Sequence, residues 1–207
     1  MELLPEALAA TPPSGATARE SDLVEISALD PSIKLDIRYA TDDNFMGTRF
    51  YSEARAFAQR DVAAALVRVN ARVRELGFGL LIHDAYRPWY VTKMFWEATP
   101  DSQKAFVADP TSGSRHNRGA AIDLSLYHLV SGDPVEMPSA YDEFSDRASA
   151  DYEGGTPRSR ELRDLLRHAM ESEGFSVYAE EWWHFDHETW RDYPVTNLTF
   201  DQISGGR

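Results

Sequence analysis

The stretch AAIDLSLYHLVSGDPVEM, residues 120–137, indicates which kind of sheet this chain forms. Residues 120–130 are mostly apolar and are typical of a strand. The turn residues Ser131-Gly132-Asp133-Pro134 follow, and we expect residues 135–137 to form a short return strand. Two strands joined by so short a turn are antiparallel. The hairpin therefore favours an antiparallel sheet.

Further strands and helices are expected on both sides of this hairpin. Apolar residues recur at helical spacing over residues 57–76, and Gly77 ends that helix. Pro88 opens a second helix that runs to about Ala98, and a third helix is expected over residues 160–173. The remaining strands are expected at residues 24–28, 33–38, 78–83, 175–178 and 182–187, and a long loop is expected at residues 138–157.

The order of these elements predicts the fold class. Unevenly spaced helices and a hairpin indicate α+β architecture, with a mainly antiparallel central sheet flanked by helices. A chain of 207 residues is sufficient for one well-buried domain. We expect a flexible N-terminal tail at residues 1–21, rich in Ala, Pro, Thr and Ser, and a single domain at residues 22–207.

The composition excludes several classes of partner. A net charge of −13 disfavours nucleic acid, because phosphate binding needs a basic surface. No apolar run approaches the length of a membrane span, and the N-terminus lacks the basic and apolar regions of a signal peptide. We therefore expect no membrane partner and a cytoplasmic location, and the sequence leaves a homo-oligomer open. The chain has no cysteine, so a metal would have to be bound by His, Asp and Glu.

His116, Asp123 and His184 make a three-ligand set for a divalent metal. Catalytic zinc sites commonly use three protein ligands and leave one position to water or substrate. Gly119 lets the chain turn between His116 and Asp123, so that both side chains return to one cleft at the sheet. Alternatively, His184 is a buried, hydrogen-bonded histidine of the core that binds no metal. His187 competes with His184 for the role of third ligand.

A carboxylate beside the metal could take a proton from water, which makes the chain a candidate metallohydrolase. Glu181 and Glu180 both precede His184. In a regular strand, Glu181 and His184 would point to opposite faces. The backbone must therefore bend if Glu181 is to share the cleft, and residue types alone leave Glu180 as an alternative.

Arg87 follows a strand that we expect at the centre of the sheet and precedes a helix. Sites are commonly built from such strand-end loops. A cation at this position could stabilise the oxyanion that forms when a carbonyl is attacked. The alternative is an ion pair between Arg87 and Asp84 that serves only the structure.

Four separated segments together resemble the VanX-type D-alanyl-D-alanine dipeptidases, within the family of zinc D,D-peptidases. The resemblance covers roughly residues 24–190. Its segments are Tyr39-Ala40-Thr41-Asp42-Asp43-Asn44-Phe45-Met46-Gly47, Asp84-Ala85-Tyr86-Arg87-Pro88, His116-Asn117-Arg118-Gly119-Ala120-Ala121-Ile122-Asp123 and Glu181-Trp182-Trp183-His184. The last segment favours Glu181 over Glu180 as the base.

The resemblance also implies substrate contacts. It places a substrate-binding aspartate at Asp142, and further substrate contacts at Ser114 and Tyr51. The segment before Tyr51 is shorter than in the family pattern. Arg115 stands where the family can carry a small hydroxyl residue, which leaves open how the substrate's carboxylate is held.

The expected function is zinc-dependent hydrolysis of D-Ala-D-Ala and similar small D,D-dipeptides. One Zn²⁺ per chain would be bound by His116, Asp123 and His184, with Glu181 as general base and Arg87 at the oxyanion. The alternatives are a D,D-carboxypeptidase or cell-wall peptidase with the same metal site, a catalytically silent zinc-binding module, and an iron oxygenase with a two-histidine, one-carboxylate site.

Overall fold

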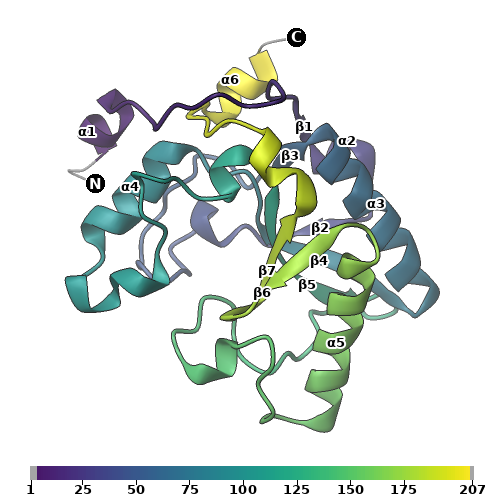
Figure 1. Cartoon of the computed structure of the whole chain (residues 1–207). Helices are drawn as coiled ribbons and strands as arrows, with labels where there is room; N and C mark the ends of the chain where they lie inside the picture. Colours follow the sequence, from purple (N-terminus) through teal and green to yellow (C-terminus); the bar gives the residue numbers. More distant parts are fainter. Residues whose placement is uncertain (1–3, 206–207) are drawn as a thin grey trace.

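The computed structural model describes residues 4–205 and shows a central five-stranded sheet with helices around it (Figure 1). The strands lie in the order β2-β4-β5-β7-β6. They are β2 (Lys34–Leu35), β4 (Phe78–Asp84), β5 (Ala121–His128), β6 (Phe175–Tyr178) and β7 (Glu181–His187). The β2–β4 pair is parallel and the other pairs are antiparallel. The predicted α+β class with a mainly antiparallel sheet is confirmed.

Strands β4 and β5 form the buried centre of this sheet, since every residue of β4 is buried. Gly79 of β4 lies directly opposite Tyr127 of β5. A Cβ atom at Gly79 would lie 2.3 Å from the tyrosine ring, so glycine leaves room for that ring to lie over the strand. The Tyr127 hydroxyl donates to the Ser32 carbonyl at 2.8 Å, which fixes the ring in this place.

Two long helices, α3 (Arg60–Glu75) and α5 (Pro157–Glu171), contact each other and the strands of the sheet (Figure 1). Helix α3 packs on β4, and α5 packs on β5, β6 and β7. The apolar positions that predict α3 are buried against this core, as helical spacing requires. The other helices are α1 (Leu4–Ala9), α2 (Ile26–Leu29), α4 (Trp89–Ala98) and α6 (Phe200–Gly205), with 3₁₀ helices η1 (Arg38–Ala40), η2 (Asp101–Phe106), η3 (His116–Arg118), η4 (Asp146–Ala148) and η5 (Glu188–Asp192).

Two helices begin at other residues than the sequence predicts. The helix expected from residue 57 begins at Arg60, because Phe57–Gln59 form strand β3 and pair with β1 (Leu23–Glu25) in a separate two-stranded sheet. Helix α5 begins at Pro157 instead of residue 160, and the Thr156 side chain caps it by accepting from the Ser159 amide.

Both predicted N-terminal strands are shorter in the structure. The strand expected at residues 24–28 ends at Glu25, where the short helix α2 begins. The strand expected at residues 33–38 is reduced to β2, and η1 follows it. Each of these strands pairs with its neighbour over only two or three residues. Local β-propensity predicts the strands but does not determine where their pairing ends.

The expected return strand at residues 135–137 is wrong. In this part of the described chain, Tyr127 and Pro134 form a single antiparallel bridge, and the Val135 amide donates to the Leu126 carbonyl at 3.0 Å. Proline has no N–H to donate, which limits a regular ladder at this point.

Residues 4–9 form helix α1, which contacts α4 and buries Ala7. Residues 1–3 and 206–207 lie outside the described residues, and the flexibility expected for residues 1–21 stays a prediction. Over residues 4–205, no helix is both long and apolar enough to cross a membrane.

Candidate active site

Strands β5 and β7 place two of the predicted metal ligands side by side. Asp123 and His184 are directly opposite each other in the antiparallel β5–β7 pair. Opposite residues project from the same face of a sheet with their Cβ atoms close together. This pairing brings residues about sixty positions apart in the chain into contact, and His184 Nδ1 lies 3.0 Å from Asp123 Oδ1.

The third predicted ligand, His116, begins the 3₁₀ helix η3. Gly119 ends this helix in the left-handed region at φ 65°. A Cβ atom at Gly119 would lie 2.4 Å from a methyl group of Leu23, so both the conformation and the space favour glycine. His116 Nδ1 donates to the Ala85 carbonyl at 2.7 Å. The donated proton leaves the Nε2 lone pair free to face the other two ligands.

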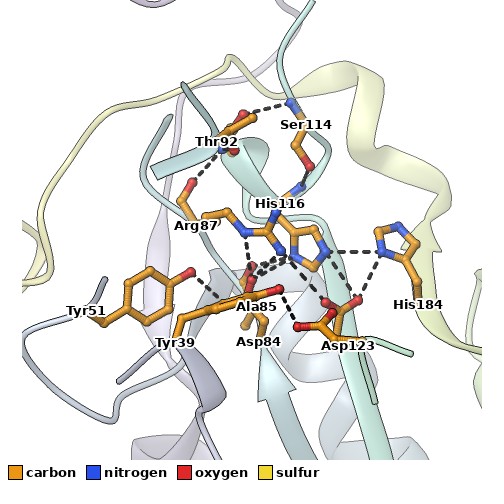
Figure 2. A network of polar contacts seen from close by, with 12 residues as sticks. Tyr39, Tyr51, Asp84, Ala85, Arg87, Thr92, Ser114, His116, Asp123 and His184 are labelled. Atoms are coloured by element: carbon orange, nitrogen blue, oxygen red, sulfur yellow. Dashed lines mark hydrogen bonds and ion pairs between the residues drawn. The ribbon is translucent and has the colours of Figure 1, made fainter. Parts of the chain in front are cut away.

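The three side chains meet in a buried cluster (Figure 2). Each offers one ligand atom, and these atoms all lie within 4.8 Å of one another. His116 Nε2 lies 3.1 Å from His184 Nδ1 and 3.3 Å from Asp123 Oδ1. Despite these short distances, Asp123 Oδ1 has no hydrogen-bond partner among the described residues.

A buried carboxylate oxygen without a donor is rare in proteins. Here it faces two imidazole nitrogens, and oxygen and nitrogen ligands of this kind suit a divalent metal such as zinc. The cluster therefore fits a metal ion, and a metal would satisfy the atom that the protein leaves without a partner.

A distortion of strand β7 brings Glu181 into the same cleft. Regular pairing with β6 runs from His187 back to Phe185, but Tyr178 then pairs with Glu181 because the register shifts. This irregularity supplies the bend that the three-residue spacing requires. Glu181 Oε2 lies 3.8 Å from His184 Nδ1. Burial raises the pKa of the Glu181 carboxyl, an effect that the nearby His184 opposes.

Arg87 lies in the cleft and also pairs with Asp84. Its Nε and Nη2 contact Asp84 Oδ2 at 2.9 and 2.8 Å, and its Nη2 lies 3.9 Å from Asp123 Oδ2 (Figure 2). The Arg87 guanidinium also lies 5.1 Å from the centre of the Tyr39 ring. Arg87 therefore forms the ion pair with Asp84 and also lies in the cleft. The same Nη2 atom that contacts Asp84 is thus the one that approaches Asp123.

The structure separates the three predicted substrate contacts. Asp142 and Ser114 line the cleft. Tyr51 is buried, does not line the cleft, and donates from its hydroxyl to Asp84 Oδ1 at 2.8 Å. Among the described residues, Tyr51 therefore lies where it supports Asp84, and a direct substrate contact through it stays a prediction.

Asp142 has an unusual backbone and environment. It has a φ of 58°, a value that non-glycine residues adopt uncommonly. The Tyr39 hydroxyl donates to Asp142 Oδ2 at 2.9 Å. Burial raises the pKa of the Asp142 carboxyl, and the charge of Asp123 raises it further. Such a carboxyl would gain from a cationic ligand.

Tyr141 is a contact of the cluster that the sequence did not reveal. Its hydroxyl donates to Asp123 Oδ2 at 3.0 Å, so one oxygen of Asp123 is hydrogen-bonded while the other faces the histidines. The Tyr141 ring stacks on His83 with centroids 4.7 Å apart. Tyr141 lies in the long irregular loop, where no periodicity indicates which side chains turn inwards.

The cleft that these residues share has a volume of about 1240 Å³. Phe45, Phe95, Trp183 and Trp190 provide apolar walls, and its lining includes no residue of α3 or α5. The cleft thus opens on the side of the sheet away from these two helices. A cluster of candidate metal ligands, a carboxylate and a guanidinium in one cleft are typical of metallohydrolases.

Comparison with known proteins agrees with this class. The family model for D-Ala-D-Ala dipeptidases, Peptidase_M15, matches residues 19–203. The D-alanyl-D-alanine dipeptidase of Escherichia coli (strain K12) is 35% identical over 184 residues, which cover 89% of this chain and 92% of the relative. The D-alanyl-D-alanine dipeptidase of Enterococcus faecium is 34% identical over 82% of this chain and 91% of the relative. A solved structure of the vancomycin-resistance D,D-dipeptidase VanXYg covers 80% of this chain and 67% of that chain, with a TM-score of 0.42 and 16% identity.

The chain belongs to the Peptidase_M15 family of D-Ala-D-Ala dipeptidases. The family predicted from the four sequence motifs is confirmed. Membership in a metallopeptidase family and the buried cluster together support a metal cofactor.

Proposed function

We propose that the protein is a zinc-dependent dipeptidase that hydrolyses D-Ala-D-Ala and similar small D,D-dipeptides to free amino acids. The observation that carries this proposal is the unpartnered Asp123 Oδ1, which faces two histidine nitrogens beside Glu181 and Arg87. A site that only stabilised the fold would need neither the carboxylate nor the guanidinium. The names of the relatives support the choice of substrate.

His116, Asp123 and His184 would bind one Zn²⁺ per chain. When bound, zinc supplies Lewis-acid chemistry, because it polarises a carbonyl and lowers the pKa of water towards ~7. Glu181 takes a proton from the attacking water and later delivers it to the leaving amine. Arg87 stabilises the negative charge that develops on the carbonyl oxygen.

Asp142 binds the free ammonium group of the substrate. Its carboxylate lies in the cleft, and a charge-assisted pair in such a partly buried site is strong. This contact would make the enzyme selective for a substrate with a free N-terminus. Ser114, which borders the same cleft, contributes a further polar contact to the substrate.

The experiment measures zinc content and D-Ala-D-Ala hydrolysis in the wild type and in His116→Ala. The wild type should contain about one zinc per chain, lose activity to a chelator and recover it when zinc returns. His116→Ala should lose both zinc and activity. If the wild type leaves D-Ala-D-Ala intact but cleaves the terminal D-Ala from a pentapeptide, the protein is a D,D-carboxypeptidase and not a dipeptidase.

A further inference from the structure

Asp186 lies next to the cluster of His116, Asp123 and His184 but is not one of these three candidate metal ligands. It follows His184 by two positions in β7, so both side chains project from the same face of the sheet. Asp186 Oδ1 lies 3.0 Å from His184 Nε2. The other oxygen of this carboxylate, Oδ2, accepts from Arg115 Nη1 at 2.6 Å.

The contact between Asp186 and His184 decides which ring nitrogen can bind a metal. A neutral imidazole has one N–H donor and one acceptor nitrogen. An ionised carboxylate only accepts, so the Nε2 of His184 must carry the proton that is donated to Asp186. The lone pair is then on Nδ1, the nitrogen that faces Asp123 Oδ1 and His116 Nε2.

The two histidines of the cluster are therefore oriented by different acceptors. His116 donates its other ring proton to the backbone carbonyl of Ala85. His184 has a side-chain acceptor, which mutation can remove. Outer acceptors of this kind hold ligating histidines in one tautomer and orientation.

Arg115 holds Asp186 from the other side. Its guanidinium lies 4.8 Å from the centre of the Trp190 ring, so that it is restrained by an ion pair and by an aromatic face. Asp186 has a side-chain exposure of only 13%, whereas Arg115 lines the cleft and is 38% exposed. Arg115 also precedes His116 directly, and thus links the segments that carry the two histidines.

We propose that Asp186 and Arg115 are positioning residues for the metal site: Asp186 fixes the tautomer and orientation of His184, and Arg115 fixes Asp186. The proposal deepens the proposed function and rests on its metal site. In this proposal Arg115 positions Asp186 and does not anchor the substrate's carboxylate.

The first test measures zinc affinity by competition between the protein and a chromophoric chelator. Asp186→Ala should weaken zinc binding by about 10–100-fold, the usual effect of losing such a partner. Asp186→Asn conserves volume and keeps one acceptor for His184, so it should bind zinc with an affinity between those of Asp186→Ala and the wild type. Asp192→Ala is the matched control, because Asp192 also pairs with an arginine but lies outside the cleft lining. Its zinc affinity should equal that of the wild type.

A double-mutant cycle tests whether Arg115 acts through Asp186. Arg115→Ala alone should weaken zinc binding by less than Asp186→Ala. In the Asp186→Ala background, Arg115→Ala should have no further effect on zinc affinity. If Arg115 instead anchored the substrate, Arg115→Ala would raise KM and leave zinc affinity unchanged. That result would overturn its proposed role.

Wild-type zinc affinity in both Asp186→Ala and Asp186→Asn would overturn the role of Asp186. If Asp186→Ala fails to fold, an unchanged affinity of Asp186→Asn is sufficient to reject it. A wild-type protein that binds no zinc would instead reject the proposed function, so the two failures are distinguishable.

Discussion

Glu181 and Glu180 are adjacent in the chain but occupy different environments. Glu181 is half-buried and lies 3.8 Å from His184, whereas Glu180 is exposed in the turn before β7. Both residues line the cleft, but the contact with His184 makes Glu181 the better placed of the two for the proposed proton transfer. The register shift in β7 creates this difference. The sequence motif alone could only favour Glu181 over Glu180 as the base.

Glu181→Ala should reduce kcat by about 10²–10⁴-fold, the usual contribution of a general acid–base group. Its zinc content should stay that of the wild type, because Glu181 is not one of the three clustered ligands. Glu180→Ala is the control and should remain active. Steady-state kinetics with zinc analysis checks both variants, and the reverse pattern would make Glu180 the base.

Arg87 has two roles to separate, one towards Asp84 and one towards the reaction. Arg87→Ala should lower kcat by about 10²–10³-fold, as the loss of one oxyanion donor does. It also leaves the buried Asp84 without its cation, which should lower the thermal midpoint.

Arg87→Lys distinguishes these effects because it keeps a cation beside Asp84 but lacks the planar guanidinium. We expect it to recover the thermal midpoint more fully than kcat. If kcat stays at the wild-type value in Arg87→Ala while KM rises, Arg87 is a substrate anchor and the oxyanion assignment is wrong.

At the scale of elements, the contact between α3 and α5 depends partly on one carboxylate. Glu173, just after α5, contacts Arg68 at 2.6 Å and Arg72 at 2.7 Å, both on α3. Its side chain is 8% exposed, although the arginines are more than half exposed. Hydrogen bonds from Arg68 and Arg72 lower the pKa of the Glu173 carboxyl below its ordinary value of 4.5.

Glu173→Gln should therefore reduce the free energy of unfolding at neutral pH, by about 1 kcal/mol given the exposed arginines. A carboxyl whose pKa is lowered by folding stabilises the protein above its unfolded pKa and loses this effect as the pH falls through its folded pKa. The gap between variant and wild type should be full above pH 4.5 and should shrink below it.

Urea unfolding at neutral pH and in steps to about pH 3 measures this gap. Glu171→Gln, which loses an exposed pair with Arg167 on the same helix, should show a smaller gap at neutral pH. A Glu173→Gln gap that stays constant over the whole pH range would contradict the predicted contribution of these ion pairs to stability.

The sequence predicts those helices and strands that are marked by a local pattern of residues. Periodic apolar residues located α3, and the apolar run at residues 78–83 located the central strand β4. The apolar periodicity predicts a helix at residues 57–59, whereas their strand depends on pairing with β1, a long-range contact without a local pattern. The β7 register shift is likewise set by the packing of two strands.

The same distinction applies to the candidate site. Residue types and motifs were sufficient to select His116, Asp123 and His184, which the fold brings together. Asp186 had a signal, since alternate residues of a strand share a face, but its value depended on knowing which face His184 occupies. Tyr141 had no signal because it comes from an irregular loop.

At the scale of the whole molecule, the site joins distant segments. The three clustered side chains come from η3, β5 and β7, Arg87 follows β4, and Asp142 lies in the loop after β5. A ligand that binds only the folded state stabilises it by mass action. Zinc should therefore raise the thermal midpoint of the wild type, and scanning calorimetry of apo and zinc-loaded protein measures the shift.

The central claim is that this fold builds a dipeptidase selective for substrates with a free ammonium group. Its most direct test compares kcat/KM for D-Ala-D-Ala and N-acetyl-D-Ala-D-Ala in the zinc-loaded wild type and in Asp142→Ala. We predict that the wild type cleaves the free dipeptide far better, because acetylation removes the cation that Asp142 is proposed to bind, and that Asp142→Ala narrows this preference. Equal cleavage of both substrates by the wild type would contradict the account.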